Sequence, residues 1–426
     1  MANGVPARAG LSPSERRATF WLLGLMVLQL SCQMVLLFEQ LAALRVVFRM
    51  AAFTVGLVAL VMVPGRPVRH PSRWPGLIAL AIVGLNVLHP TTNTLLVGLA
   101  QTALYVAILS PLFWVPRLAV TPAVFGRLIA ALWAWYTLSA AVGVLQVYFP
   151  GALQPAVSTA IREMGEMAEG MKITLSDGTA VWRPMGLTDA PGGAAGLIGM
   201  LLGLVCIYLC QVRSLLIMAG VSAVALAAVL VAAGWGARAT RLLLSVPAVA
   251  VGAFVWALAL GGEGVSKRYE TLLADNPGAV YYQNRGQFLE HTVDVLLPQF
   301  PAGAGLGRWG AMRGYFGDPY DPASPLIYVE IQLTGWLLDG GVALILAYTA
   351  ALVAACWAAA KAAFGSADRW LAGWAALVLA YDIGAVAITF NYPLFIGQGG
   401  MEFWLLNAAV FTAAARARAV RPAGPR

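Results

Sequence analysis

Long apolar segments recur along the whole chain, and this recurrence restricts the possible folds more than any other feature. Of the 426 residues, 60% are hydrophobic and only 11% are charged, whereas about a quarter of the residues in soluble domains are charged. A helix needs about 20 apolar residues to cross the hydrocarbon core of a bilayer, and an open sheet cannot satisfy its backbone there. The sequence therefore predicts an all-α polytopic membrane protein.

Eleven windows have the length and apolarity of a spanning helix. They are 18–38, 44–63, 74–89, 94–115, 122–149, 192–212, 213–236, 241–260, 332–358, 367–390 and 395–416. We expect about 10–12 spans in three blocks. The N-terminal helices lie within 1–149, the central helices within 192–260 and the C-terminal helices within 332–416, before a cytoplasmic tail at 417–426. The polar segments 150–191 and 261–331 separate the blocks.

The charge pattern indicates the orientation, because basic loops stay on the cytoplasmic side. The N-terminus, the C-terminal tail and the turns around Arg69 and Arg117 are rich in arginine. Segments 150–191 and 261–331 instead hold five acidic against three basic residues and eight against five, so both should be extracytoplasmic. This orientation requires an odd number of crossings between 213 and 261, yet two apolar windows lie there. Either one of them is re-entrant or interfacial, or the stretch forms three short spans.

The run GLGRWG at 305–310 fits the glycine pattern of a dinucleotide-binding turn. That pattern has this meaning only within a βαβ unit, and here it lies in an extracytoplasmic segment between membrane helices. We therefore exclude a nicotinamide site. Two readings remain: a simple chain reversal beside the membrane, or a backbone that approaches a ligand closely. The neighbouring arginines suggest a phosphate in the second case.

Four arginines outside the basic clusters are candidates for binding an anion. Arg183 and Arg285 each precede a helical segment at the expected mouth of the bundle, and Arg308 and Arg313 border the glycine run. A guanidinium near a bilayer must pair or reach the headgroups, and its fork of donors suits phosphate oxygens. Each arginine alone fits a headgroup contact better. Together, in two segments on one side of the membrane, they predict an anionic ligand.

Carboxylates provide the candidates for acid–base chemistry. Glu330 lies where segment 261–331 re-enters the membrane, so we expect it to act as a general base. Asp382 and Glu402 lie inside apolar windows, where carboxylates indicate function by default, and this keeps a proton-coupled transporter open. The four cysteines lie in apolar segments and the chain has three histidines, so we expect no disulfide framework, no metal site and no cofactor.

The order of these motifs resembles that of the O-antigen ligase and O-antigen polymerase superfamily of bacterial inner-membrane glycosyltransferases. The motifs are WRPMGLTDAPGGAAG at 182–196, NRGQFLEHTVDVLLPQFP at 284–301, GAGLGRWG at 303–310 and YVEIQLTGWLLDGGVAL at 328–344. The resemblance covers roughly residues 140–350. It implies a helical membrane fold with a large periplasmic loop, an architecture like that of GT-C glycosyltransferases, and an active site that faces the periplasm.

The resemblance also implies a reaction, namely metal-independent transfer, with inversion, of a glycan from undecaprenyl diphosphate to a glycan acceptor. Arg183 and Arg285 match the two arginines that hold the diphosphate in the superfamily. We expect six further residues to bind the substrate: Arg308, Arg313, Trp182, Tyr281, Tyr282 and Trp309. The expected partners are the lipid-linked donor, the acceptor, membrane lipids and a chain-length regulator and flippase of the same pathway, but no nucleic acid.

One departure from the superfamily pattern concerns the catalytic base. The ligases place a histidine just before the helix that follows the glycine run, whereas this chain has no histidine after His291. Glu330 lies nearest to that position. We therefore predict a polymerase for O-antigen, capsule or exopolysaccharide, in which Glu330, Arg285 and Arg183 are catalytic. The alternatives are a ligase that acts on a lipid core, a transporter or flippase of lipid-linked glycans, an inactive paralogue, and a structural subunit of an envelope assembly.

Overall fold

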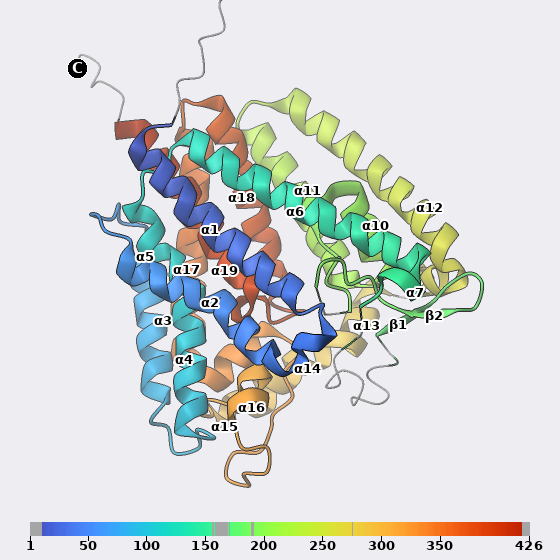
Figure 1. Cartoon of the computed structure of the whole chain (residues 1–426), viewed down its shortest axis with the longest axis horizontal. Helices are drawn as coiled ribbons and strands as arrows, with labels where there is room; N and C mark the ends of the chain where they lie inside the picture. Colours follow the sequence, from blue (N-terminus) through green and yellow to red (C-terminus); the bar gives the residue numbers. More distant parts are fainter. Residues whose placement is uncertain are drawn as a thin grey trace, which may run out of the picture.

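The protein is a helical bundle that carries one small β-hairpin among its described residues (Figure 1). The computed structural model describes residues 11–155, 157, 169, 171–188, 191–274 and 276–419. In this part of the chain, seven helices are long and apolar enough to cross a membrane. They are α1 (Pro13–Val35), α2 (Arg45–Met62), α6 (Pro122–Tyr148), α11 (Arg213–Ala232), α12 (Gly236–Ala274), α17 (Gln332–Gly365) and α18 (Arg369–Ile388). The prediction of an all-α polytopic membrane protein is confirmed.

An eighth span is possible where two helices meet at a bend. α4 (Leu95–Leu109) is followed by α5 (Pro111–Trp114) and the 3-10 turn η2 (Val115–Arg117), at an angle of 46°. Three predicted windows fall outside this set. α3 (Arg73–Asn86) and α10 (Met200–Leu209) are shorter than a spanning helix, and α19 (Gln398–Ala419) contains Glu402 and Asn407. The windows thus identified helices correctly, but not every helix has the length and apolarity of a full span.

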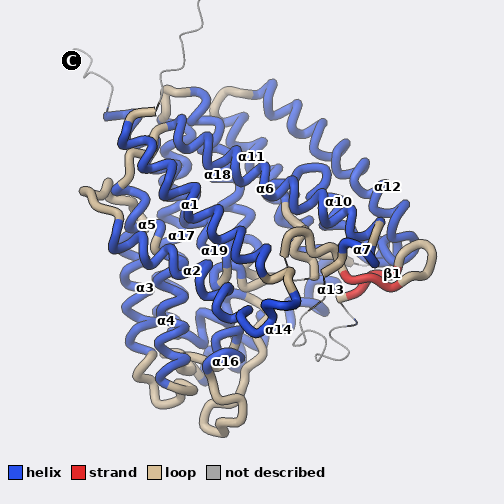
Figure 2. Tube along the Cα trace, viewed as in Figure 1, coloured by secondary structure: helices blue, strands red, loops and turns tan. Residues whose placement is uncertain are grey.

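Short elements connect these helices, and Figure 2 shows loops below α3, α4 and α16 and the two strands on the right, near α7. On the N-terminal side they are η1 (Glu39–Leu44), α7 (Pro150–Leu153) and η3 (Leu197–Gly199). Residues 277–299 form one helical run of α13 (Pro277–Tyr281), η4 (Tyr282–Gly286), α14 (Gln287–His291), η5 (Thr292–Leu296) and α15 (Leu297–Gln299). α16 (Gly310–Phe316) and η6 (Leu394–Ile396) complete the set.

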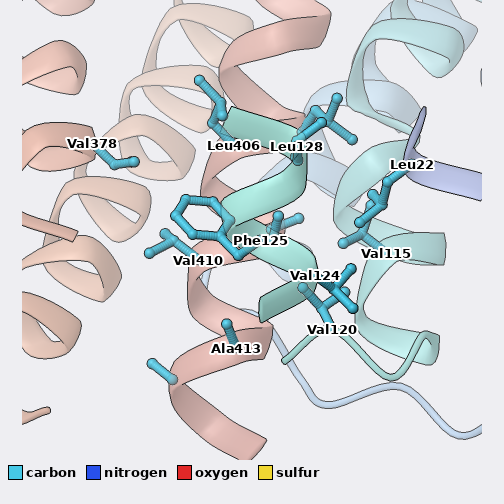
Figure 3. Packing of buried hydrophobic residues seen from close by; sticks show 14 of the residues in the cluster. Leu22, Val115, Val120, Val124, Phe125, Leu128, Val378, Leu406, Val410 and Ala413 are labelled. Carbon is cyan, nitrogen blue, oxygen red and sulfur yellow. The ribbon is translucent and has the colours of Figure 1, made fainter. Parts of the chain in front are cut away.

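The core of the bundle lies between α1, α6 and the last three helices. Figure 3 shows Phe125 and Leu128 of α6 beside Leu406 and Val410 of α19, all of them buried in one apolar cluster. In α17, buried alanines recur every four residues at 347, 351, 355 and 359, and α17 packs against α3 and α18. Small side chains on one face let helix backbones approach closely. The alanine-rich sequence of α17 therefore suits a central helix.

A break in α17 holds the segment before the glycine run in place. The backbone leaves the helical conformation at Gly340 and Gly341, and Gly341 has a φ of 66°. A Cβ on Gly341 would lie 2.2 Å from the carbonyl oxygen of Pro301. The amide of Val342 donates to that oxygen at 2.9 Å, and the amide of Ala304 donates to the carbonyl of Leu338 at 2.7 Å. The loop backbone thus occupies the space that a side chain at Gly341 would fill.

The sheet is a two-stranded hairpin that packs on α12. β1 (Lys172–Thr174) pairs antiparallel with β2 (Ala180–Trp182), with Lys172 opposite Trp182. In the turn between the strands, the amide of Ser176 donates to the carbonyl of Leu260 at 3.1 Å. α12 bends beside this contact, at Gly262, which has a φ of 51°. The hairpin therefore packs on the C-terminal part of α12, beside the bend at Gly262.

The described residues of segment 184–211, namely 184–188 and 191–211, then follow α6 into the bundle. Near the C-terminal end of α6, the side-chain oxygen of Gln146 accepts hydrogen bonds from the amides of Met185 and Gly186, both at 2.9 Å. Near the middle of α6, the carbonyl oxygen of Tyr136 lies 3.2 Å from the position that a Cβ on Gly199 would take. The chain has therefore moved along α6 from its end to its middle.

α10 then runs back toward the end of α6 at which the segment entered. The chain reverses at Met200, which has a positive φ of 49°. The thiol of Cys206 donates to the carbonyl of Ala140 at 3.4 Å, and that of Cys210 contacts the carbonyl of Pro184 at 3.8 Å. Because Cys210 returns to Pro184, the segment enters and leaves at one end of α6. Window 192–212 predicted a single spanning helix, and this prediction is wrong, since hydropathy does not register a chain reversal.

Candidate active site

Two of the three predicted catalytic residues form an ion pair. Nη1 of Arg285 lies 2.8 Å from Oε2 of Glu330, and the side chains are 35% and 20% exposed. Nε of Arg285 also donates to the carbonyl of Asn391 at 3.0 Å, and the hydroxyl of Tyr328 donates to Glu330. Residues 45 positions apart in sequence thus place a cation and a carboxylate at one partly exposed point.

Arg285 lies in the irregular part of the helical run 277–299. Residues Tyr282–Gly286 form a π-helical turn, a feature found frequently at functional sites. A Cβ on Gly286 would lie 3.1 Å from the ring of Tyr282, so a side chain there would require the ring to shift by a few tenths of an ångström. The run is tied to α17 by the hydroxyls of Thr292 and Thr334, which lie 2.6 Å apart in the interior. These contacts fix the helix that carries Arg285.

Glu330 lies in an extended segment, 325–331, between two loops. On one side, the amide of Ile327 donates to the carbonyl of Arg308 at 2.8 Å. On the other side, the amide of Gln332 donates to the carbonyl of Thr389 at 2.9 Å. The buried side chain of Gln332 then accepts from the amide of Phe395 at 2.7 Å. The glycine run and the 389–395 loop therefore position the backbone around Glu330.

Arg308 and Arg313, predicted to bind substrate, are each only 5% exposed and donate to backbone carbonyls. Nε and Nη1 of Arg308 donate to Pro325 at 2.9 Å and Ala304 at 3.1 Å. Arg313 donates to the carbonyls of Gly307, Ser324 and Pro319. Burial, together with the neighbouring Arg313, lowers the pKa of the Arg308 guanidinium. Their donors hold loop 304–325 together, a role that the sequence pattern did not reveal.

Trp309 is also buried, with 3% of its surface exposed. Its indole nitrogen donates to Oδ1 of Asp339 at 2.9 Å. Oδ2 of the same carboxylate accepts from the hydroxyl of Tyr105 at 2.7 Å and from Nε2 of Gln101 at 3.1 Å. Asp339 thus links the glycine run to α4 and α17 through three neutral donors. Sequence reasoning did not identify this network, although an acidic residue directly before a glycine pair in an apolar window was a visible signal.

The predicted aromatic residues other than Trp309 lie nearer the surface. Tyr282 is 52% exposed, and its hydroxyl donates to Glu290, which raises the pKa of the tyrosine. The hydroxyl of Tyr281 donates to the carbonyl of Phe390 at 3.4 Å, beside the loop that contacts Arg285. Trp182 ends the hairpin, where the ammonium of Lys172 lies 5.1 Å from its ring. Tyr281 and Tyr282 are therefore the two predicted aromatics nearest to Arg285 in sequence and in the fold.

Arg183, the third predicted catalytic residue, follows the hairpin directly. Its amide donates to the carbonyl of Met171 at 3.1 Å, and its guanidinium lies close enough to the thiol of Cys210 to interact electrostatically. Arg183 therefore lies against the returning segment 184–211, whereas Arg285 and Glu330 lie beside residue 391. In the described ranges, no group of three or more His, Cys, Asp or Glu side chains is arranged to hold a metal ion.

Comparison with known proteins adds no family to this geometry. Neither a scan against family models nor a search of curated proteins finds a match for the chain. The function is therefore inferred from the residues and their arrangement.

Proposed function

We propose that this protein is a bacterial inner-membrane glycosyltransferase that polymerises oligosaccharide repeat units carried on undecaprenyl diphosphate. The observation that supports this function best is the Arg285–Glu330 ion pair, at 2.8 Å and partly exposed. A carboxylate can accept a proton from a sugar hydroxyl. A guanidinium can bind the oxygens of a diphosphate through two parallel hydrogen bonds. The two groups required for inverting transfer from a diphosphate carrier are thus adjacent.

In the proposed reaction, Glu330 accepts the proton of the acceptor hydroxyl as its oxygen attacks the anomeric carbon. The bond between that carbon and the diphosphate oxygen breaks, and its electron pair leaves with the diphosphate. Arg285 neutralises the charge that grows there, for which a well-placed donor contributes about 3 to 4 kcal/mol of barrier lowering. Before substrate binds, Glu330 neutralises Arg285. Binding of the diphosphate to Arg285 then frees the carboxylate to act as a base.

The remaining predicted site residues divide into two groups. Arg183 and Trp182, beside the hairpin, and Tyr281 and Tyr282, beside Arg285, keep the substrate-binding role in this proposal. Exposed aromatic rings can stack on the faces of sugar rings. Arg308, Arg313 and Trp309 instead maintain the loop that positions Glu330, because their donors are used by backbone carbonyls and by Asp339.

An apolar groove provides room for the lipid chain of the donor. It has a volume of about 710 Å³ and is lined by α1, α2 and the end of α16, including Leu28, Met50, Val55 and Phe316. Arg49, on α2, donates from Nη1 to the hydroxyl of Tyr315 at 2.5 Å, which places a cation near Phe316. A groove with apolar walls and a basic residue suits a long hydrocarbon chain with an anionic headgroup.

We further infer ten crossings, with both termini in the cytoplasm and an architecture like that of GT-C glycosyltransferases. The crossings are α1, α2, α3, α4 with α5, α6, α11, α12, α17, α18 and α19, so this count includes α3, which is shorter than a usual span, and α19, which is outside the seven apolar spans. The returning segment 184–211 supports this count, because Cys210 lies beside Pro184. Two crossings, α11 and α12, then join residues 213 and 261 on one side, which removes the inconsistency in the charge pattern. In this arrangement Arg285 and Glu330 face the periplasm.

The test is the length of the glycan in cells whose only copy of the protein is wild type, Arg285→Ala, Arg285→Lys, Glu330→Gln or Asp294→Asn, at matched expression. We expect Arg285→Ala and Glu330→Gln to stop at one lipid-linked repeat on the periplasmic leaflet. Arg285→Lys should be intermediate, because it keeps the charge but not the planar fork. Asp294 is exposed in the same helical run, so Asp294→Asn should leave the glycan at full length.

The second candidate function is a carrier of lipid-linked glycans, which the fully buried Asp382 in α18 favours. The same experiment separates the two candidates. In a carrier, the inactive variants would accumulate repeats on the cytoplasmic leaflet, and Glu330→Gln would have no effect.

A further inference from the structure

A second group of polar residues lies deep in the bundle, in α18, α19 and the turn between α2 and α3. Asp382 is 0% exposed and Asn407 is 1% exposed. Nδ2 of Asn407 donates to Oδ1 of Asp382 at 2.7 Å and to the carbonyl of Phe403 at 3.0 Å. Within the described part of the chain, Oδ2 of Asp382 and Oδ1 of Asn407 have no hydrogen-bond partner. Two oxygen atoms are therefore buried with their acceptor capacity unused.

His70 approaches the same place from the turn. It is 2% exposed, and its ring packs edge-on against Phe411 of α19 with the ring centres 4.7 Å apart. Nδ1 accepts from the amide of Ser72 at 3.1 Å, so the proton of the neutral ring is on Nε2. The ring lies within hydrogen-bonding reach of the backbone carbonyl of Asn407, although Nε2 makes no hydrogen bond of ordinary geometry with the described residues. Asn407 therefore lies between His70 and Asp382.

Among the described residues, none supplies a positive charge to Asp382. The titratable groups that face it are Cys356 of α17 and Tyr381 of α18, and Tyr381 in turn faces Glu402 of α19. No ion pair between described residues includes Asp382. An ionised carboxylate without a partner is too costly to keep in such an interior. A ligand must therefore neutralise it.

The atoms available fit a proton better than a metal ion. Calcium takes six to eight oxygen ligands and magnesium requires an octahedral shell, whereas the described residues here leave two side-chain oxygens free. A proton requires a single oxygen atom. Burial lowers the pKa of His70 to about 3, so this ring is neutral near pH 7 and does not compete for the charge. A neutral imidazole and an amide are suitable neighbours for a carboxylic acid.

We infer that Asp382, Asn407 and His70 form a proton-binding site inside the bundle, which exchanges its proton through the turn between α2 and α3. The exposed Arg69 directly precedes the buried His70, so His70 lies one residue from the surface of that turn. This site is separate from Arg285 and Glu330, and its occupancy does not depend on the proposed glycosyl transfer. Through this site, the pH on the side of the membrane where the turn lies would affect the contact between α18 and α19.

The test is infrared spectroscopy of the full-length protein in lipid nanodiscs, in water and in deuterium oxide. A protonated carboxyl has a C=O stretching band that is separate from the bands of ionised carboxylates and shifts on deuteration. We expect wild type at neutral pH to show a component of this band that is lost in Asp382→Asn and retained in Glu402→Gln, which removes the half-buried carboxylate of α19 as a control. His70→Phe should keep the component but slow its exchange with deuterium.

Three results would overturn the inference. If Asp382→Asn removes no component, the carboxylate is ionised. If the component depends on the concentration of Na⁺ or K⁺, the site binds a metal cation. If His70→Phe exchanges as fast as wild type, the turn is not the route. Should Asp382→Asn fail to fold, Asp382→Glu serves in its place, because it should shift the frequency of the component instead of removing it.

Discussion

At the scale of single residues, the candidate site depends on which partners the charged side chains in and near loop 304–325 bind. Arg308 and Arg313 look like ligand-binding residues in the sequence, because they border a glycine run in an extracytoplasmic segment. In the structure their donors reach carbonyls of the same loop. Arg285 and Glu330 instead face each other at the surface. The hydrogen-bond partners, and not the residue types, therefore distinguish Arg308 and Arg313 from the pair of Arg285 and Glu330.

The acid sensitivity of this loop is predicted to depend on Asp321. Its carboxylate accepts from the hydroxyl of Ser324 at 2.5 Å and from the amide of Ala323 at 2.9 Å. These bonds, assisted by Arg313 and Arg308, lower the pKa of Asp321 below its usual range. The stabilisation is therefore complete above the unfolded pKa of about 3.9 and is lost as the pH falls through the lower folded value.

Limited proteolysis of loop 317–325 over this acid range measures the effect. Asp321→Asn should make the loop more susceptible than wild type at neutral pH, and the difference should vanish in acid below the folded pKa. Asp294→Asn, which is exposed elsewhere in the same segment, serves as the control and should follow wild type throughout. A constant difference between Asp321→Asn and wild type at every pH would contradict the assignment.

At the scale of elements, the break in α17 decides where the glycine run can dock. Gly341→Ala should displace the loop, because a Cβ there would lie 2.2 Å from the carbonyl oxygen of Pro301 and because the φ of 66° disfavours alanine. A non-glycine residue in such a conformation costs about 1 to 3 kcal/mol, before the clash is counted. Thermal unfolding in detergent, followed by tryptophan fluorescence, should show a clear loss of stability and a change in the emission of buried Trp309.

The control for this substitution is Gly220→Ala. Gly220 lies within α11, and a Cβ there would meet no atom within 4 Å. Alanine is favoured over glycine inside a helix by roughly 0.5 to 1 kcal/mol, so this variant should be as stable as wild type or slightly more stable. If Gly341→Ala and Gly220→Ala have the same thermal stability, the break in α17 tolerates a side chain.

Hydropathy predicted where helices lie in the sequence, but it did not predict the path of the chain between them. All eleven windows contain helix, because a buried or lipid-facing helix of this size is apolar wherever it lies. Hydropathy does not show that window 192–212 reverses at Met200, since the residues on both sides of the turn are equally apolar. For the candidate site, residue type and position singled out Arg285 and Glu330, which the structure brings together as an ion pair; their catalytic role stays a proposal. The partners of Arg308, Arg313 and Trp309 depend on contacts between distant segments, which no local pattern reports.

At the scale of the whole molecule, the number of crossings depends on segment 184–211. Alkaline phosphatase, which is active only outside the cytoplasm, can be fused after Gln211 and after Gly234. We expect activity after Gln211 and none after Gly234, because α10 returns to the end of α6 at which it entered. A fusion after Ala152, extracytoplasmic in every arrangement considered, is the positive control. Inactivity after Gln211 would mean that α10 crosses the membrane and that the count of ten is wrong.

The three donors to Asp339 also set an order for biogenesis. Tyr105 and Gln101 belong to α4, which is synthesised and inserted long before α17, and Trp309 arrives between them. When α17 enters the membrane, its carboxylate therefore meets hydrogen-bond donors that are already in place. A chain whose α4 is misinserted would instead leave an acidic group unsatisfied in an apolar interior, at a cost of several kcal/mol. Asp339 thereby makes the stability of α17 depend on the correct insertion of α4.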